Sequence, residues 1–355
     1  MLRRELIKRM RILYIAYPLL PVSDASAGGA EQMLWTLERE MHRRGHETTV
    51  AACAGSTISG RLHATGNVPQ QSDTFEARNR QHHHAIRNLL QCESFDLIHD
   101  KSGSFFARAA DIRTPLIATL HLPRSFYGAI DWRALNPRMT LNCVSNSQSN
   151  DFADIPNLVG AIPNGIALDR FPLHIDKDQY LLWLGRICEE KAPHLAIEVA
   201  RRSGRSLVLA GQVYPFSYHQ QYFAREIAPN LGADVEFINT PSFEGKLDLL
   251  AHAAAVLIPS QVDETSSLVA MEAMACGTPV VASRRGALPE VISDGETGFL
   301  VDNIDSMAAA IDHLSSIRPE ACRARVERNF SAARMTDDYE SLYSRVLGRS
   351  VREAA

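Results

Sequence analysis

Short aliphatic segments alternate with helical segments along most of the chain, and this alternation constrains the fold more than any other feature. In the first half, residues 31–44 carry apolar side chains at helical spacing and are followed by Gly45, which can end a helix. Helices between successive strands are typical of parallel sheets with right-handed crossovers. The strands predicted for this half are residues 12–16, 48–52, 96–99, 115–119 and 141–145.

The alternation restarts after residue 179. Residues 193–203 predict a helix, and the polar segment 169–179 predicts a connector between two domains, for which 355 residues suffice. We therefore predict an α/β protein with two Rossmann-like, doubly wound parallel sheets, whose ligands bind beyond the carboxyl ends of the strands. The strands predicted for the second half are residues 180–184, 206–210, 235–238, 256–258 and 279–282.

The charge balance argues against a nucleic-acid partner. The chain has 37 Lys and Arg against 41 Asp and Glu, a formal net charge of −4. Nucleic-acid binding usually needs an extended basic surface, which such a balance does not supply. We expect no nucleic-acid partner.

Cysteine usage and hydropathy indicate a cytoplasmic protein. None of the six cysteines lies within four residues of another, so we expect buried thiols in a reducing compartment. No apolar run approaches the roughly 18 residues of a membrane span. Residues 1–9 are basic but lack the apolar core of a signal peptide, which makes Met10 an alternative start. A second interpretation of these residues is a basic helix in peripheral contact with the cytoplasmic membrane.

The segment 263–279 contains an acidic residue inside an apolar helix. Ser266 or Ser267 can cap the start of this helix, and Gly277 can end it. Its side chains are apolar on nearly every face, so the helix is expected to be buried together with Glu272. A buried carboxylate needs a partner. Two partners are open: an internal cation, or a pair of hydroxyl groups on a ligand.

A second acidic residue, Glu264, precedes the same helix. Glu272 follows it eight positions later, which is at most roughly 12 Å along a helix axis. Between them lie the unpaired N–H groups of the helix start, around Ser266, Ser267 and Leu268, which form an anion site. Carboxylate, anion site and carboxylate follow the order of sugar hydroxyls, diphosphate and ribose hydroxyls in a nucleotide sugar.

Positive charge is expected at the carboxyl end of another strand. Arg186 and Lys191 lie directly after the strand 180–184. Arginine can bind a phosphate with two parallel hydrogen bonds, and lysine can add a point charge. We therefore predict that this loop contacts the diphosphate.

These motifs together resemble the retaining glycosyltransferases of family 4. The spacing of Glu264 and Glu272 resembles the donor signature of that family, and the resemblance covers essentially the whole chain. It implies the GT-B architecture, with two Rossmann-like domains facing across a cleft: residues 1–172 on the acceptor side, 173–334 for the nucleotide sugar, and a helix in 335–355 that crosses back. The other matching motifs are residues 28–31, 119–121, 144–147, 163–166, 185–191, 295–300 and 330–343.

The resemblance also implies roles for the residues of the second domain. Glu264 would bind hydroxyls of the donor sugar, and Glu272 those of the ribose. Arg186 and Lys191 would neutralise the diphosphate, together with backbone N–H groups near Ser267 and Leu268. Arg186, Lys191 and Glu264 are thereby expected to be catalytic, and Ser266 is counted with the donor site.

In the first domain the resemblance implies three further site residues. Gly28 and Gly29 would let the main chain approach the β-phosphate and the donor sugar, because neither has a Cβ. His121 would lie near the reacting centre as a catalytic residue. The implied reaction is retaining transfer from a nucleotide diphosphate sugar to a hydroxyl of a sugar, glycolipid or small molecule, with no metal and no cofactor.

Two other functions stay open, and a third is disfavoured. A sugar-nucleotide 2-epimerase and a non-catalytic sugar-nucleotide-binding protein both fit the donor motifs. A dinucleotide-dependent oxidoreductase predicts G-x-G-x-x-G after the first strand, which residues 27–31 do not match.

Two regions of the first domain invite a functional interpretation. Residues 82–84 are three successive histidines, but adjacent helical positions point in different directions, so we predict a solvated helix face and no metal site.

Residues 56–91 and 122–137 are expected to shape the acceptor site. The second of these regions contains Arg124, Phe126, Tyr127 and Trp132, which suit a sugar or glycolipid but equally a packed loop.

Overall fold

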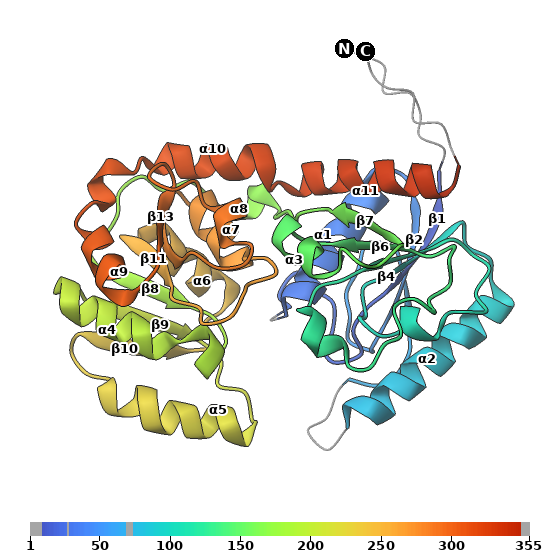
Figure 1. Ribbon diagram of the computed structural model, residues 1–355, viewed down its shortest axis with the longest axis horizontal. Coiled ribbons are helices and arrows are strands. Elements are labelled where there is room, and N and C mark those ends of the chain that lie inside the picture. Colours follow the sequence, from blue (N-terminus) through green and yellow to red (C-terminus); the bar gives the residue numbers. More distant parts are fainter. Residues whose placement is uncertain (1–8, 27, 69–73, 349–355) are drawn as a thin grey trace, which may run out of the picture. The chain divides into compact units, whose positions relative to one another are not determined.

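The computed structural model describes residues 9–26, 28–68 and 74–348 (Figure 1). The chain divides into two units, one made of residues 1–165 and 332–355 and the other of residues 166–331. The two interpretations of residues 1–9, a start at Met10 or a basic helix at the membrane, concern residues that lie almost wholly outside the described part of the chain.

Unit 1 is built on a parallel seven-stranded sheet. Its strand order is β3-β2-β1-β4-β5-β6-β7, so the order reverses between β1 and β4. Ligands of such sheets bind at this switch point, beyond the carboxyl ends of the strands. The strands are β1 (Arg11–Ile15), β2 (Glu47–Ala52), β3 (Arg61–Ala64), β4 (Leu97–Asp100), β5 (Leu116–Thr119), β6 (Thr140–Cys143) and β7 (Leu158–Ala161).

Helices cover both faces of this sheet because side chains alternate between its faces along each strand. Leu13 and Ile15 of β1 pack in one core with Ile86 of helix α2. Tyr14 between them belongs to the other face, where its hydroxyl accepts a hydrogen bond of 3.3 Å from Tyr343. The helices are α1 (Gly29–Arg43), α2 (Phe75–Cys92), α3 (Asn146–Asp151) and α11 (Ala332–Val346), with short helices η1 (Phe106–Arg108) and η2 (Arg124–Tyr127).

Unit 2 repeats this plan with a parallel six-stranded sheet. Its strand order is β10-β9-β8-β11-β12-β13, and the order reverses between β8 and β11. Loops after these two strands therefore flank the expected ligand position. The strands are β8 (Leu181–Leu184), β9 (Leu207–Gly211), β10 (Val235–Asn239), β11 (Ala255–Ile258), β12 (Val280–Ser283) and β13 (Gly298–Val301).

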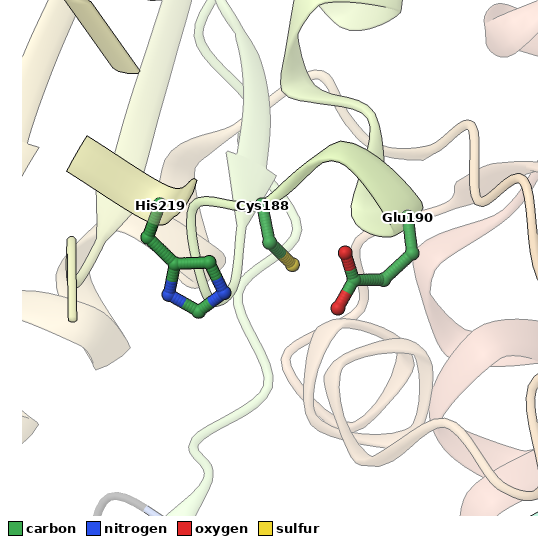
Figure 2. Close-up of side chains that lie close together, drawn as sticks. All are labelled: Cys188, Glu190 and His219. Atoms are coloured by element: carbon green, nitrogen blue, oxygen red, sulfur yellow. The ribbon is translucent and has the colours of Figure 1, made fainter. Parts of the chain in front are cut away.

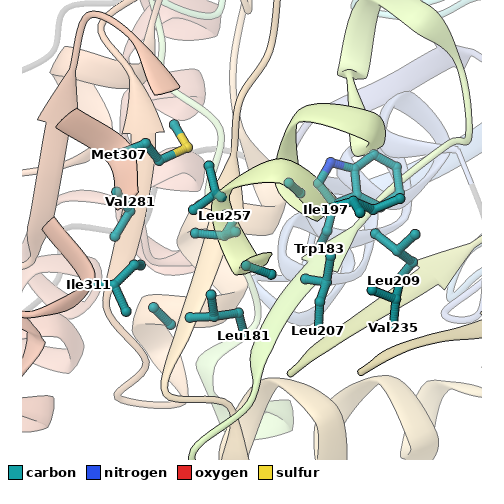
Figure 3. Packing of buried hydrophobic residues seen from close by; sticks show 14 of the residues in the cluster. Leu181, Trp183, Ile197, Leu207, Leu209, Val235, Leu257, Val281, Met307 and Ile311 are labelled. Atoms are coloured by element: carbon teal, nitrogen blue, oxygen red, sulfur yellow. The ribbon is translucent and has the colours of Figure 1, made fainter. Parts of the chain in front are cut away.

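One core of unit 2 lies between its sheet and helices α4 and α9 (Figure 3). Trp183 and Leu209 of the sheet pack there with Ile197 and Met307 of the two helices. Helix α7 contacts β11 and β12 as well as α6 and α10. The α-helices of this unit are α4 (Pro193–Ser203), α5 (Ser217–Tyr222), α6 (Phe243–His252), α7 (Leu268–Ala275), α8 (Leu288–Val291), α9 (Ile304–Ile311) and α10 (Pro319–Asn329). The other helical segments are η3 (Leu168–Arg170), η4 (Glu189–Lys191), η5 (Phe223–Ile227), η6 (Ala228–Asn230) and η7 (Leu314–Ser316).

The predicted fold class is confirmed, but the connector lies elsewhere. The chain passes between the units at residues 165/166 and 331/332, not at the predicted 172/173 and 334/335. Residues 169–179 pack within unit 2: the His174 N–H donates to the Cys276 carbonyl at 3.1 Å, and Lys177 Nζ donates to the Ala251 carbonyl at 2.6 Å. Polar composition suggested a linker, but polar groups of this segment bond to residues of unit 2, and Lys177 Nζ also donates to Thr278 Oγ1 at 2.9 Å.

Two predictions about buried residues in unit 1 need correction. A solvated helix face was predicted for residues 82–84, but His82 and His83 are buried. Each has a polar partner inside the protein: His82 Nδ1 lies 2.6 Å from Thr65 Oγ1, and His83 Nε2 lies 3.1 Å from Ser104 Oγ. Among the three histidines, His84 alone is exposed. Five of the six cysteines are buried as expected, whereas Cys92 is exposed at the end of α2.

The aromatic loop of unit 1 is partly a packed structure. Tyr127 and Trp132 lie edge to face with ring centroids 5.6 Å apart, and both contact Phe152. Phe126 is 72% exposed and stays available to a ligand.

Over the described residues, none of the helices combines the length and the apolar character that a membrane span requires.

Candidate active site

Lys191 and Glu264 meet at the switch point of unit 2. Lys191 ends η4 in the loop after β8, and Glu264 lies in the loop after β11. Lys191 Nζ lies 2.6 Å from Oε1 and 2.5 Å from Oε2 of Glu264. Ser260, also after β11, donates a hydrogen bond to Glu264 Oε1. Two neighbouring strands thus bring a cation and a carboxylate to the place where their order in the sheet predicts a ligand.

Neighbouring residues fix the backbone of both Glu264 and Lys191 through hydrogen bonds and close packing. The Ala287 N–H donates to the Glu264 carbonyl at 2.7 Å. Gly286 has φ +51°, and a Cβ there would lie 2.4 Å from the Glu264 carbonyl oxygen, so a larger residue would displace the loop. The Trp183 indole N–H donates to the Lys191 carbonyl at 3.2 Å. The Glu264 side chain is 9% exposed and that of Lys191 is 31% exposed, which leaves the ammonium within reach of a ligand.

Arg186 lies in the same loop as Lys191 but has a different acidic partner. Its guanidinium donates to Glu190 Oε1 at 3.0 Å, and its side chain is 44% exposed. An exposed pair of this kind contributes little to stability and is readily exchanged for another anion. The structure therefore keeps both predicted phosphate-binding cations on one loop, each paired with a carboxylate.

Glu272 is buried in α7, as predicted, and its partner is Lys246 of α6. Lys246 Nζ lies 2.8 Å from Glu272 Oε1, and the two side chains are 15% and 6% exposed. The ammonium also lies 5.0 Å from the centre of the Phe243 ring and 5.7 Å from that of Phe171. Of the two partners left open by the sequence, the structure shows the internal cation; binding of ligand hydroxyls stays a prediction.

The start of α7 matches its predicted cap. Ser267 Oγ accepts a hydrogen bond of 3.4 Å from the Ala270 N–H, and helical geometry begins at Leu268. Both Ser266 and Ser267 thus lie at the amino end of the helix, between Glu264 and Glu272 along the chain. Unpaired N–H groups at such an end favour an anion.

Gly28 and Gly29 lie where β1 connects to α1, at the switch point of unit 1. A Cβ on Gly28 would lie 2.0 Å from Glu31 Oε2. The missing side chain therefore makes room for a carboxylate of the protein itself, an arrangement that sequence spacing did not indicate. Glu31 is 6% exposed, and burial raises its pKa to about 7. Gly29 begins α1.

His121 follows β5 and lies near a buried lysine that sequence reasoning missed. Its backbone N–H donates to Tyr127 Oη at 2.9 Å. Burial, followed by the charge of Lys101, holds the pKa of His121 well below its usual value. Lys101 follows β4, is 1% exposed and lies 5.2 Å from the centre of the Tyr339 ring. Burial lowers the pKa of Lys101 to about 7.

Of the two lysines that were missed, only Lys101 had a weak sequence signal. Lys101 directly follows the buried run of β4, the kind of position at which Lys191 was sought in unit 2. Lys246 is 26 residues from Glu272 and lies on another helix, so only the packing of α6 against α7 shows that they meet.

The two parallel-sheet units define the GT-B class of glycosyltransferase folds, and comparisons with known proteins agree. A sequence family described as "Glycosyl transferases group 1" matches residues 166–330, and one described as "Glycosyltransferase Family 4" matches residues 27–170. Together the two family models cover residues 27–330, and the chain belongs to the glycosyltransferases that they describe.

Curated relatives match about half of the chain. The D-inositol 3-phosphate glycosyltransferase of Corynebacterium efficiens is 33% identical over 190 residues, which cover 49% of this chain and 43% of that protein. The protein of the same name from Mycobacterium marinum is 32% identical over 183 residues, covering 48% and 39%. The chain thus matches less than half of the length of these relatives.

Solved structures match nearly the whole chain. Sucrose-phosphate synthase from Thermosynechococcus elongatus superposes with a TM-score of 0.81 and 19% identity, covering 96% of this chain and 100% of that one. Anabaena HepE in complex with UDP and glucose gives a TM-score of 0.75 and 18% identity, with 95% and 100% covered. AviGT4, a glycosyltransferase involved in avilamycin A biosynthesis, gives 0.70 and 24%, with 96% and 99% covered. At these identities the likeness concerns the fold.

Proposed function

We propose that this chain transfers a sugar from a nucleotide diphosphate sugar to an acceptor hydroxyl, with retention at the anomeric carbon and without a metal ion. The observation that carries the proposal is the Lys191–Glu264 pair, bound by Ser260 at the switch point of unit 2. Support for the donor class comes from HepE, a neighbour by fold that was solved with UDP and glucose.

Donor binding would exchange the partners of this ion pair. A diphosphate brings negative charge that competes with Glu264 for the Lys191 ammonium, whose side chain is 31% exposed. The Glu264 oxygens would then accept hydroxyls of the donor sugar. Arg186 would turn from Glu190 to the diphosphate in the same way, with the N–H groups near Ser267 and Leu268 as further donors.

Glu272 is proposed to bind the ribose while its pair with Lys246 persists. A carboxylate offers about four acceptor sites on its two oxygens. The contact with Lys246 involves Oε1, so the ion pair fixes the orientation of the carboxylate without using its whole capacity. Lys246 is therefore proposed as a positioning residue.

The chemical step would use the growing charge on the leaving group. The bond between the anomeric carbon and the phosphate oxygen breaks, a bond to the acceptor oxygen forms on the same face, and the acceptor proton passes to the departing phosphate. Arg186 and Lys191 stabilise that phosphate more strongly as its charge develops, which is what accelerates a reaction. No carboxylate acts as nucleophile, in contrast to glycosidases that use paired carboxylates.

Unit 1 is proposed to supply the remaining groups. The main chain at Gly28 and Gly29 would approach the donor phosphate and sugar, and His121 would lie near the reacting centre. The acceptor is a sugar, a glycolipid or a small molecule. D-Inositol 3-phosphate is the first to test, because the relatives named above carry it in their name. We infer a cytoplasmic location, with peripheral membrane contact as the alternative.

The test begins with a thermal-shift screen against UDP-, GDP-, ADP- and TDP-sugars, because a bound ligand raises the apparent stability by mass action. The stabilising donor is then incubated with an acceptor panel. The proposal expects nucleotide release over many turnovers that depends on the acceptor, and a glycosylated product by mass spectrometry with the donor's anomeric configuration by NMR. An epimerised nucleotide sugar, or release without acceptor, would contradict it.

Metal independence is tested with the same assay. Because two side-chain cations and a helix end face the diphosphate in this proposal, EDTA should leave turnover largely intact. Loss of turnover in EDTA that added Mg²⁺ restores would show that a divalent ion takes part in the reaction.

A further inference from the structure

Cys188, Glu190 and His219 converge in unit 2 (Figure 2). One ligand atom of each, the sulfur, a carboxylate oxygen and a ring nitrogen, lies within 4.8 Å of the other two. Cys188 and Glu190 belong to the loop after β8, and His219 lies in α5 after β9. These two strands are parallel neighbours, so their loops leave the sheet at the same edge.

The His219 ring is buried without the hydrogen bonds that an imidazole needs. The residue is 0% exposed, and neither Nδ1 nor Nε2 has a hydrogen-bond partner among the residues that the structure describes. Tyr214, Phe216 and Tyr218 surround it, with ring centroids 6.1, 5.5 and 4.2 Å away. A buried polar group without a hydrogen bond destabilises the folded chain. A ligand that binds a ring nitrogen would remove this cost.

The other two side chains are suited to the same ligand. Cys188 is 0% exposed, and its thiol makes a weak hydrogen bond of 3.3 Å to the Arg186 carbonyl. In Figure 2 its sulfur lies between the imidazole and the Glu190 carboxylate. Glu190 is 34% exposed, which gives an ion a route from solvent.

We propose that Cys188, Glu190 and His219 bind a Zn²⁺ ion. Thiolate, imidazole and carboxylate are the three ligand types of zinc sites, which complete a tetrahedron with a fourth ligand such as water. Sulfur and nitrogen donors exclude Mg²⁺ and Ca²⁺, which require oxygen. One thiolate and one carboxylate balance the charge of the ion. Metal–ligand bonds of about 2.0–2.3 Å require the three atoms to draw together from their present spacing, which side-chain rotation can provide.

Glu190 connects this zinc site to Arg186. Its carboxylate accepts a hydrogen bond from the Arg186 guanidinium at 3.0 Å, and an ion would compete for the same group. Zinc occupancy would therefore release Arg186. The zinc site itself does not depend on the role of Arg186 in donor binding, and the proposed transfer does not use the ion.

The test is a calorimetric titration of the metal-free full chain with Zn²⁺ alone, without nucleotide. We expect one ion per chain. Substituting Co²⁺ should give the thiolate-to-metal charge-transfer absorption. Cys188→Ser and His219→Ala should each weaken binding by more than the roughly 10–100-fold that loss of an outer-shell contact causes. Cys92→Ser removes the exposed thiol of α2 and should bind as the wild type does.

A third variant keeps the test decisive if the buried substitutions unfold the chain. Glu190→Gln changes a half-exposed side chain and should weaken Zn²⁺ binding while the metal-free chain keeps its unfolding temperature. Absence of stoichiometric binding, or equal binding by wild type and either folded Cys188→Ser or Glu190→Gln, would overturn the site. Because donor binding is measured separately in EDTA, such a result would leave the proposed transfer standing.

Discussion

The carboxyl ends of the strands differ between the two units. In unit 2 they carry charged side chains in pairs, as in Lys191 with Glu264. In unit 1 they carry buried bases, Lys101 and His121, whose pKa values are lowered mainly by burial. Two sheets that share the order of their first six strands thus provide different chemistry: exchangeable charge on one, and groups that titrate near or below neutrality on the other.

The difference indicates how each unit would meet a substrate. Paired charges can be exchanged for those of a diphosphate without leaving a charge unsatisfied. A buried base instead favours its neutral form and can accept a proton or a hydrogen bond. We therefore expect unit 2 to determine the affinity for an anionic donor, and unit 1 to determine how the protein responds to pH.

The largest expected effect tests the Lys191–Glu264 pair of unit 2. Lys191→Met removes a cation that the proposal places on the leaving phosphate, so kcat should fall about 10²–10³-fold, as for loss of one oxyanion donor. Steady-state kinetics should show a smaller change in KM. Arg202→Met, on the surface of α4, removes a cation from an exposed ion pair of the same unit and serves as the control. A fall in kcat equal to that of the control would contradict the role of Lys191.

The second prediction concerns the stability of the two pairs within unit 2. Lys246→Met leaves Glu272 buried beside apolar groups, which should lower the free energy of unfolding by up to about 3 kcal/mol. Lys191→Met should lower it less, because Lys191 is more exposed and Ser260 still bonds Glu264. Denaturant unfolding measures both.

The double variant Lys246→Met, Glu272→Gln supplies the control. It removes both charges together and should recover part of the lost stability. Equal losses for Lys246→Met and Lys191→Met would show that the two pairs do not differ in burial as described.

The third prediction concerns the buried base of unit 1. The pKa of Lys101 is lowered from 10.5 to about 7, so between these values the unfolded chain binds a proton that the folded chain does not. The free energy of unfolding should therefore rise with pH across this range, by up to about 1.4 kcal/mol per pH unit from this group. Lys101→Met should remove this slope and be more stable than the wild type at pH 7.

Denaturant unfolding at several pH values from 7 to 10 measures the slope. A slope unchanged in Lys101→Met would mean that Lys101 titrates normally. If the variant is more stable but inactive, the lysine is retained for function at a cost in stability.

The sequence predicted central strands better than peripheral ones. The strands with an apolar run were found within one or two residues, whereas β3, β7 and β13 were missed as strands. All three lie at a sheet edge, where one side lacks a neighbouring strand. Both β3 and β7 are half-exposed; β3 has no continuous apolar run, and the short run of β7 contains Gly160. Helix α4 was predicted at its observed bounds because proline and glycine flank it.

For the candidate site, the sequence supplied the residues but not their partners. Arg186, Lys191 and Glu264 were found because they follow strands, and Glu272 because a lone acid interrupts an apolar helix. That Lys191 binds Glu264, 73 residues away, follows from the order of strands across the sheet, which local spacing does not encode. The place of Glu31 against Gly28 likewise depends on side-chain packing.

The most direct test of the account compares the two carboxylates in calorimetric titrations with a nucleoside diphosphate and with its sugar conjugate. Glu272→Ala should weaken both ligands alike, because it removes a ribose contact. Glu264→Ala should weaken the sugar conjugate and leave the affinity for the free nucleoside diphosphate nearly unchanged. If Glu272→Ala binds both ligands as tightly as the wild type does, Glu272 serves only its ion pair with Lys246 and the proposed donor site is wrong.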